Sequence, residues 1–381
     1  MLGTFPDRYI YGLVAWYFHC DPVQAFMFER RNEELAPLKI EATPNLVNLN
    51  LTVGDIERWD GSTSLQPVAR IVAAHAAGIP WKWRSPGGYH QRDGSEIVLT
   101  DEYWWAVDDE ISSTPTLEGT YNRHLAEHPS YHPHAGSSSP LPKYSPKEKP
   151  TPEFLNNFKF SQTHDAFINV IEGNRDLMFA TRRPSPDELK LAKEKNVELE
   201  CTPFAQDAFV FIVNRHNPVR NLTMQQVRDI FAGKVTKWKN VGGVAGTIYP
   251  LIRDRNSGSE ELMRELVMQK VPVRKNFKHQ LVGSMNGLFD ILEQDTEGIG
   301  YTILYYDRFM VCNPHTRTLQ IDGVEPTPQT VADGSYPLLY ECVAVTRKGG
   351  PERAKTIVDW LISEEGQAVI RETGYCAVAG R

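Results

Sequence analysis

Hydroxyl and guanidinium groups gather in one short run of the chain. Arg253 comes shortly before Ser257, Gly258 and Ser259. Ser257 lies three residues before Glu260, the spacing of a capping box, so we expect a helix to begin in this turn. A helix start leaves unpaired N–H groups with partial positive charge, and a glycine lets a ligand approach the backbone closely. The run therefore favours a pocket for a tetrahedral oxyanion. A capped helix after a surface arginine is the structural alternative.

Two further expected helix starts also carry hydroxyl groups. Ser62, Thr63 and Ser64 follow a glycine and precede apolar residues at helical spacing. Thr163 opens a second such start, and His164 beside it is either a ligand contact or a cap or core residue. Each hydroxyl can replace a hydrogen bond to water that a dehydrated anion loses. One such turn is more often structural, but three of them together with an arginine predict an anion site.

Ordered motifs along the chain resemble those of the periplasmic phosphate-binding proteins that serve ABC phosphate importers. The resemblance runs from about residue 57 to the end, less one insertion, and marks a divergent member of that family. Its motifs lie at residues 61–64, 173–185, 208–214, 217–223, 230–233, 238–243, 253–259, 298–301 and 360–367.

The resemblance implies an α/β fold of the type II periplasmic-binding-protein kind, with two lobes and a ligand cleft between them. Lobe 1 is expected to comprise residues 57–207 and 303–381, with a loop insertion at about 81–152. Lobe 2 is expected to comprise residues 208–302, and residues 1–56 form an N-terminal segment of unknown role.

The local sequence pattern independently predicts alternating strands and helices. The apolar run 208–213 is typical of a buried strand. Thr223 with Gln226, and Ser185 with Glu188, have capping-box spacing, so each pair predicts a helix start. This mixture of elements predicts an α/β fold.

The resemblance also implies which residues contact the ligand. They are Ser62, Thr63, Ser64, Thr163, His164, Arg253, Ser257, Gly258 and Ser259. One position departs from the family pattern, because Arg182 stands where phosphate binders place an acidic acceptor, and arginine cannot accept the proton of hydrogen phosphate. We include Arg182 among the candidate ligand residues. Its structural alternative is an ion pair with Asp187 or Glu188, in which case Asp165 or Asp60 could supply the acceptor.

The function implied is capture of phosphate or a similar oxyanion, without a cofactor, for the membrane subunits of an ABC importer. Sulfate and small phosphorylated or carboxylated solutes remain alternatives. The protein is then expected to be an extracytoplasmic monomer, periplasmic or at the cell surface. A sensor or adhesion module without transport is the functional alternative. A hydrolase in the same cleft is less favoured, because the sequence has no G-x-S-x-G elbow, His-Glu-x-x-His motif or Walker loop, and we expect no enzyme.

Composition agrees with a soluble binding protein. The chain has 381 residues, a hydrophobic content of 41% and a charged content of 23%, ordinary values for a two-domain globular protein. A formal net charge of −7 disfavours a nucleic-acid partner. The apolar run 10–18 before Cys20 is too short to span a bilayer, so no N-terminal signal is clearly recognisable.

Two features outside the expected cleft leave alternatives open. Five scattered cysteines show no zinc pattern, and the pair that we favour for a disulfide is Cys312 with Cys342, with buried free thiols as the alternative. Residues 113–150 are rich in Ser, Pro and His and predict a surface loop. A metal site is a less favoured reading of the histidines in this loop, which are His124, His128, His132 and His134.

Overall fold

The computed structural model describes residues 39–40, 47–79, 81–84, 97–100, 144–151, 154–155, 158, 160–274, 281–282, 285, 287–311, 313 and 315–378.

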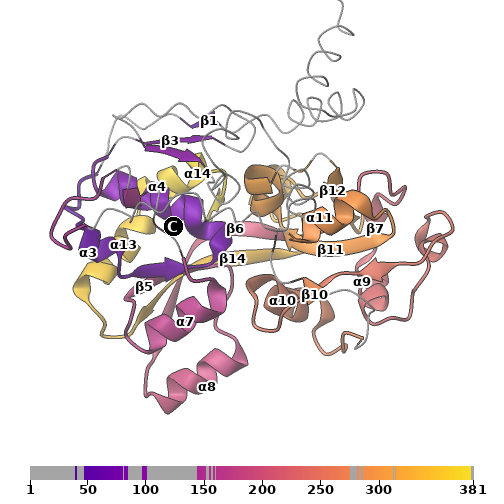
Figure 1. Ribbon diagram of the computed structural model, residues 1–381, viewed down its shortest axis with the longest axis horizontal. Helices are drawn as coiled ribbons and strands as arrows, with labels where there is room; N and C mark the ends of the chain where they lie inside the picture. The colour runs from indigo at the N-terminus through magenta and orange to yellow at the C-terminus, as the bar shows by residue number, and fades with distance from the viewer. Residues whose placement is uncertain are drawn as a thin grey trace, which may run out of the picture.

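One mixed sheet connects the two lobes of the molecule (Figure 1). Its strand order is β2-β5-β14-β6-β11-β8, and β12 and β15 also pair with β6. These strands are β2 (Trp59–Gly61), β5 (Leu177–Ala180), β6 (Leu199–Asn214), β8 (Tyr249–Pro250), β11 (Gly298–Ile303), β12 (Thr316–Thr318), β14 (Leu339–Arg347) and β15 (Cys376–Ala377). The first part of β6, from Leu199 to Ala208, pairs antiparallel with β14, and Phe209 to Val213 pair antiparallel with β11. The predicted buried strand at 208–213 therefore spans the junction between the lobes.

Lobe 1 has helices on both faces of its part of the sheet. Its helices are α3 (Val53–Ile56), the 3-10 helix η1 (Thr63–Leu65), α4 (Gln66–Ala76), α7 (Thr163–Ile171), α8 (Pro186–Glu194), α12 (Pro328–Ala332), α13 (Glu352–Leu361) and α14 (Glu364–Glu372). Successive strand residues point to opposite faces, and β5 shows this directly. Leu177 and Phe179 belong to the main core with α4, whereas Met178 and Ala180 pack with α7.

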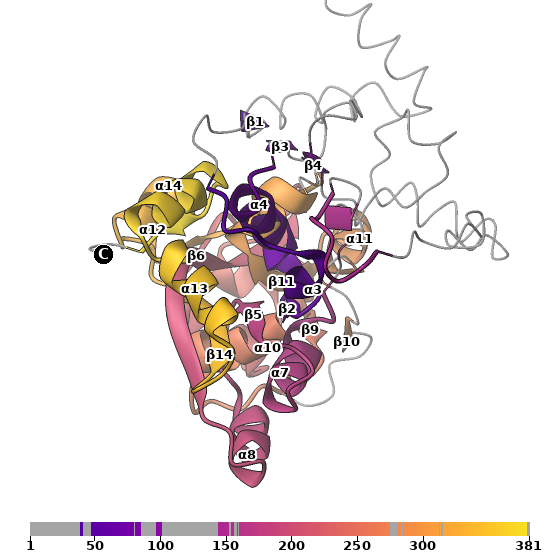
Figure 2. The same cartoon turned by 90° about the vertical axis from the view of Figure 1, so that its left-hand side faces the viewer.

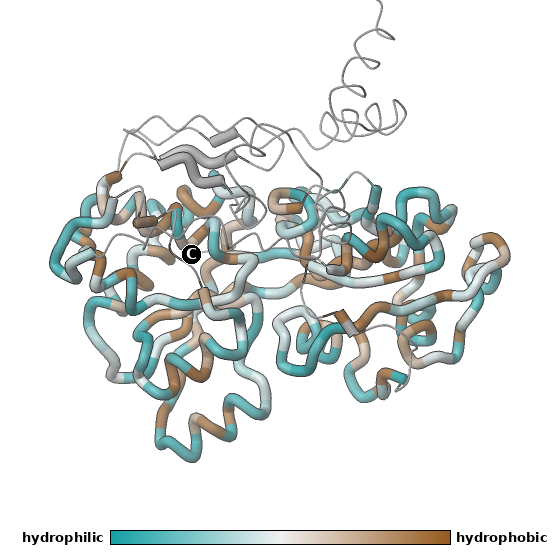
Figure 3. The backbone as a smooth tube through the Cα atoms, in the orientation of Figure 1, coloured by the Kyte–Doolittle hydropathy of each residue, from teal (hydrophilic) through white to brown (hydrophobic). Residues whose placement is uncertain are grey.

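Lobe 2 is built from shorter elements. They are β7 (Asn221–Leu222), α9 (Met224–Phe231), the 3-10 helix η3 (Trp238–Val241), β9 (Ile252–Arg253), α10 (Gly258–Leu262), the π-helix η4 (Met263–Met268), β10 (Leu281–Val282), α11 (Gly287–Gln294), the π-helix η5 (Tyr306–Val311) and β13 (Gln320–Ile321). Thr223 and Gln226 form the predicted capping box at the start of α9. Helices of both lobes alternate between hydrophilic and hydrophobic residues (Figure 3), as expected for helices with one face against a core.

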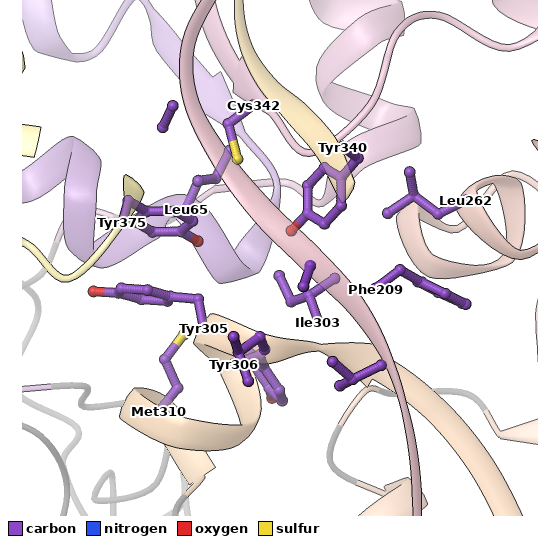
Figure 4. Packing of buried hydrophobic residues seen from close by; sticks show 14 of the residues in the cluster. Leu65, Phe209, Leu262, Ile303, Tyr305, Tyr306, Met310, Tyr340, Cys342 and Tyr375 are labelled. Carbon is purple, nitrogen blue, oxygen red and sulfur yellow. The ribbon is translucent and has the colours of Figure 1, made fainter. Parts of the chain in front are cut away.

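A buried aromatic cluster fills the junction between the lobes (Figure 4). Tyr305 and Tyr375 stack face to face, with ring centroids 3.9 Å apart. Asp207 of β6 accepts hydrogen bonds at this junction from Tyr340 Oη at 2.8 Å and from the Tyr305 amide at 3.3 Å. Burial raises the pKa of Asp207 to about 7. A single buried carboxyl thus connects β6, β14 and the segment after β11.

Strand pairing does not follow the expected lobe boundary at residue 303. The strands β12 and β13 fall within the range expected for lobe 1, but β12 pairs with the end of β6, and β13 pairs with β7 of lobe 2. These two strands therefore lie beside strands expected in lobe 2. The exact residue bounds of the lobes stay a prediction.

Parts of the N-terminal segment and of the expected insertion belong to the ordered fold. Leu51, Val53 and Ile56 lie in the main core, although the sequence offered no role for residues 1–56. In the insertion, β3 (Trp81–Arg84) forms a three-stranded sheet with β1 (Lys39–Ile40) and β4 (Ile97–Thr100). The carbonyl oxygens of Pro146 and Glu148 accept hydrogen bonds from the first turn of α3. The end of the expected loop therefore caps a helix, whereas residues 113–143 lie outside the described part of the chain.

The cysteine prediction was wrong for Cys342. This residue is buried and its thiol is free, so the favoured bridge to Cys312 is not formed; Cys312 itself lies outside the described residues. Burial raises the pKa of the Cys342 thiol well above its usual range, as expected for an apolar site. Among the described residues, no helix is long and apolar enough to span a bilayer.

Candidate functional site

A polar cavity of about 220 Å³ lies between the hydroxyl-rich turns of lobe 1 and the β9–α10 turn of lobe 2. Its lining residues are Ser62, Thr63, Ser64, Gln162, Thr163, His164, Asp165, Thr181, Arg253, Asp254, Arg255, Asn256, Ser257, Gly258, Ser259, Met285, Ile303 and Tyr306. A water molecule takes up about 30 Å³ in the liquid, so the cavity has room for a small solute. The starts of α7 and α10 contribute lining residues; Figure 1 shows these two helices apart, and in Figure 2, turned by 90°, they overlap.

Three buried hydroxyl groups of the lobe 1 wall lie close together. Ser62 follows β2, Thr163 begins α7 and Thr181 follows β5, so neighbouring strand ends and a helix start bring them together. Thr163 Oγ1 donates to Ser62 Oγ at 2.8 Å, and the Thr181 amide donates to the same oxygen at 3.3 Å. These bonds fix the hydroxyl positions without using every hydrogen, because each hydroxyl can donate one bond and accept two.

The start of α10 touches this wall from the other lobe. A Cβ atom at Gly258 would lie 3.0 Å from Thr163 Oγ1 and 3.1 Å from Thr181 Oγ1. Gly258 therefore lets the two lobes approach each other closely. The close approach of a ligand to this glycine, expected from the sequence, stays a prediction. Ser257 accepts a bond from the Glu260 amide at 3.3 Å and caps α10. Only this half of the predicted capping box forms, because the Glu260 carboxylate binds Tyr301 and Arg264 instead.

Arg253 supplies a half-buried cation to the cavity. Its Nε and Nη1 atoms are buried and have no hydrogen-bond partner within the part of the chain that the structure describes. Burial lowers the pKa of Arg253, opposed by nearby groups that include Tyr301 and Asp254. The Arg253 amide donates to Tyr301 Oη at 2.9 Å, and Tyr301 in turn donates to the buried Glu260 carboxylate. This chain of bonds fixes Arg253 relative to α10.

The structure brings all but one of the sequence-predicted site residues to this cavity. Those that line it are Ser62, Thr63, Ser64, Thr163, His164, Arg253, Ser257, Gly258 and Ser259. Arg182 is the exception and does not line the cavity. Its side chain is 1% exposed and forms two hydrogen bonds with Glu188, at 2.7 and 2.8 Å, as in the structural alternative.

The structure shows what surrounds His164 and the two carboxyl groups, Asp60 and Asp165, that could accept a ligand proton. His164 Nδ1 lies 2.8 Å from the same Glu188 carboxylate that binds Arg182. Asp60 does not line the cavity: its carboxylate accepts bonds from the amide and hydroxyl of Ser161 and from the Asn169 side chain. Asp165 does line the cavity and is exposed. Of the two alternative acceptors, the structure brings only Asp165 to the cavity wall.

Several cavity residues escaped the sequence reasoning. Thr181 lies directly after the buried strand β5 and directly before Arg182, so its hydroxyl could have been predicted as a cavity residue from the sequence. Gln162 adopts a left-handed backbone, with φ of 81°, immediately before α7. Met285, Ile303 and Tyr306 give no local signal, because they reach the cavity only through the packing of lobe 2. The four histidines of the predicted loop lie outside the described residues, and within the described ranges no cluster of three or more His, Cys, Asp or Glu side chains could hold a metal.

Two α/β lobes joined through β6, with a polar cavity between them, define a solute-binding protein by fold and site. The chain belongs to the PBP superfamily: the domain model of that superfamily matches residues 148–365, more than half of the 381 residues. The α/β, two-lobed fold predicted from the sequence is thereby confirmed.

Curated relatives carry the name phosphate-binding protein PstS. The protein from Borreliella burgdorferi is 26% identical over 185 residues, which cover 46% of this chain and 65% of the relative. The protein from Staphylococcus saprophyticus is 28% identical over 227 residues, which cover 57% of this chain and 70% of the relative. The chain thus spans about two thirds of the length of these relatives.

Solved structures give a similar comparison. A putative phosphate ABC transporter substrate-binding protein with bound phosphate from Clostridium perfringens is 26% identical, with 57% of this chain and 84% of that chain covered and a TM-score of 0.49. An ABC-type phosphate transport receptor from Vibrio cholerae is 22% identical, with 58% and 87% covered and a TM-score of 0.46.

Proposed function

We propose that this chain is a solute-binding protein that holds phosphate or a similar oxyanion in the cavity between its lobes. The proposed contacts are Ser62, Thr63, Ser64, Thr163, His164, Arg253, Ser257, Gly258 and Ser259, with Thr181 added from the structure. Arg182 is left out of the proposed ligand contacts because its guanidinium is already bound to Glu188.

The observation that carries this proposal is the state of the Arg253 guanidinium. Two of its nitrogens are buried without a hydrogen-bond partner among the described residues. Buried guanidinium nitrogens without an acceptor are unfavourable, because they have lost their hydration and gained no bond in return. An anion in the cavity supplies the opposite charge to this guanidinium. Arginine also suits an oxyanion geometrically, since its planar group can donate two parallel bonds.

The remaining cavity groups favour a small anion with several acceptor oxygens. Ser62, Thr163, Thr181 and Ser259 are at most 7% exposed and offer hydroxyl groups around the cavity. Hydroxyl groups donate and accept, so they tolerate both a fully ionised anion and one that keeps a proton. The described carboxylates on the wall, Asp165 and Asp254, are both exposed. Because neither carboxylate is buried against the ligand, we do not expect the cavity to reject sulfate strictly.

The relatives and their names support a role in uptake. We extend the proposal to delivery of the anion to the membrane subunits of an ABC importer, by an extracytoplasmic, monomeric protein. A sensor or adhesion module with the same cavity is the alternative, and the two differ in whether transport is lost when the chain is removed. Uptake of labelled phosphate by cells with and without the gene separates them.

Catalysis in this cavity lacks an activated nucleophile. A hydrolase needs a serine hydroxyl within hydrogen-bond reach of a general base. In the described part of the chain, His164 bonds to Glu188 and to no cavity hydroxyl, while Ser257 Oγ caps α10. Binding rather than reaction is therefore the proposed activity.

Calorimetry with purified protein tests the proposal. Phosphate, sulfate, arsenate and molybdate are titrated into wild-type protein and into Arg253→Ala, and at least one anion should bind the wild type tightly. Arg253→Ala should weaken that binding by roughly 2–5 kcal/mol, the range for removing one partner of a buried charge pair. Arg220→Ala is the matched control, since Arg220 is exposed and does not line the cavity. Absence of binding by all four anions, or equal effects of both substitutions, contradicts the proposal.

A further inference from the structure

Arg182 makes a contact that crosses between the lobes. Besides its two bonds to Glu188, its Nη2 donates at 3.0 Å to the backbone carbonyl oxygen of Asn256. Arg182 follows β5 of lobe 1, whereas Asn256 belongs to the β9–α10 turn of lobe 2. This bond joins the lobes through protein atoms alone.

Glu188 holds Arg182 in place for this contact. The Glu188 side chain is fully buried, and its carboxylate accepts two bonds from Arg182 and one from the Ser185 amide at 2.7 Å, with His164 Nδ1 at 2.8 Å. The Arg182 guanidinium also lies over the Phe167 ring, 5.0 Å from its centroid. A side chain fixed on several sides loses little freedom when it binds a further partner.

The β9–α10 turn is the part of lobe 2 that carries the anion donors. Asn256 comes three residues after Arg253 and directly before Ser257, and it adopts a left-handed backbone with φ of 68°. Asparagine tolerates this conformation better than most residues. Whatever holds Asn256 against lobe 1 therefore also holds the donors on both sides of it.

A second, exposed set of contacts joins the same two segments. Asp187, beside Glu188 at the start of α8, lies 3.3 Å from Arg255 and 3.4 Å from Asn256 Nδ2. The side chains of Arg255 and Asp187 are 67% and 47% exposed, so this ion pair is weak. The buried Arg182 contact is the stronger of the two.

We propose that Arg182, held by Glu188, is a positioning residue that fastens the β9–α10 turn to lobe 1 and so keeps the cavity closed around its ligand. The effect on ligand release rests on the proposed anion binding, but the contact between the lobes does not require a ligand. Arg182 acts on ligand release and not on ligand choice, because it does not line the cavity. The contact is made only when the lobes are together, so its loss should raise the dissociation rate more than it lowers the association rate.

The variant must not leave a buried charge unpaired. Arg182→Ala alone strands the Glu188 carboxylate and is expected to destabilise the whole protein. The double variant Arg182→Met with Glu188→Gln removes both charges, and the glutamine oxygen can still accept from the Ser185 amide. Asp187→Ala tests the exposed contacts and leaves the core unchanged. Arg183→Ala is the control, because Arg183 is exposed, pairs with Glu341 and does not line the cavity.

Stopped-flow release of phosphate and small-angle X-ray scattering of ligand-free protein test the inference. The double variant should release phosphate about 10- to 100-fold faster, the range for one hydrogen bond to a charged group, with association changed by less than about threefold and the phosphate-to-sulfate affinity ratio unchanged. Its radius of gyration without ligand should exceed that of the wild type and of Arg183→Ala. Asp187→Ala should accelerate release by about fivefold at most.

Three results decide against the inference. Unchanged release by the double variant shows that the Asn256 contact does not hold the lobes. An altered phosphate-to-sulfate ratio shows that Arg182 acts on the ligand directly. If wild-type protein binds none of the four anions, the proposed function fails, and an unchanged radius of gyration in the double variant then overturns the positioning role separately.

Discussion

Gly258→Ala is expected to weaken anion binding without destabilising the protein. The added Cβ would lie 3.0 Å from Thr163 Oγ1 and 3.1 Å from Thr181 Oγ1, closer than most Cβ contacts. The hydroxyl groups or the α10 start must therefore move apart by a few tenths of an ångström, which displaces donors from the positions that a bound anion needs. Overpacking of this kind costs about 1–3 kcal/mol, which corresponds to an affinity loss of roughly 5- to 150-fold.

The effect on folding should be small or opposite in sign. Gly258 has an ordinary helical backbone and no positive φ, so alanine fits its conformation. Alanine is favoured over glycine in a helix by up to about 1 kcal/mol, and the lobes can separate slightly to relieve the new contacts. The melting temperature should thus stay level or rise while affinity falls.

Calorimetry with phosphate and thermal unfolding measure the two effects on the same protein. Glu265→Ala is the control, since Glu265 is exposed on the helical segment that continues α10 and does not line the cavity. In a Thr181→Ala background the Gly258→Ala penalty should shrink, because one of the two close contacts is gone. An affinity equal to the wild type within twofold would refute the close approach of the lobes at Gly258.

Three further predictions address the junction, the selectivity and the expected loop. The raised pKa of Asp207, about 7 against 3.8 for a free side chain, means that the folded state binds an extra proton between those values. The contribution of Asp207 to the free energy of unfolding is thus present at low pH and is lost as pH rises from about 4 to 7, by roughly 4 kcal/mol at most. Asp207→Asn should flatten the dependence of this free energy on pH, measured by urea unfolding. The same dependence in wild type and variant contradicts this. Because the described cavity residues include no buried carboxylate, the affinities for phosphate and sulfate should lie within about 100-fold of each other, and phosphate affinity should rise as pH rises through the second ionisation of phosphate. Competition calorimetry across a pH series measures both quantities. Strict rejection of sulfate at every pH would contradict this prediction, because it requires an acceptor for the phosphate proton. Replacing residues 113–143 by a short Gly/Ser linker should leave phosphate affinity unchanged. Extending the replacement through residue 150 should lower the melting temperature, because Pro146 and Glu148 accept hydrogen bonds from α3. Equal melting temperatures for the two deletions contradict this.

Local sequence patterns predicted the turns that form the site. The capping pairs Thr223–Gln226 and Ser185–Glu188 both form as expected, since a hydroxyl and a side chain three residues later satisfy each other within one turn. The hydroxyl-rich starts before α4 and α7 and the Arg253 turn were likewise readable. Each depends on neighbours in sequence, so residue type and spacing suffice to predict them.

Long-range pairing decided what the sequence left open. The sequence predicted Glu188 as a capping residue, and in the fold its carboxylate also contacts Arg182 and His164. The bonds to Glu188 hold Arg182 away from the cavity wall. Asp60 was an equally open choice until Ser161 and Asn169 occupied its carboxylate.

Residue type and spacing were enough to predict the α/β class and the hydroxyl-rich turns, because these follow from local hydrogen bonding and apolar periodicity. Only the tertiary structure decided which arginine stays without a partner. Arg182 and Arg253 both follow or end a strand close to the cavity, and nothing local separates them. A guanidinium binds whichever acceptor the folded chain brings within reach, so Arg182 pairs with Glu188, whereas two nitrogens of Arg253 have no acceptor among the described residues.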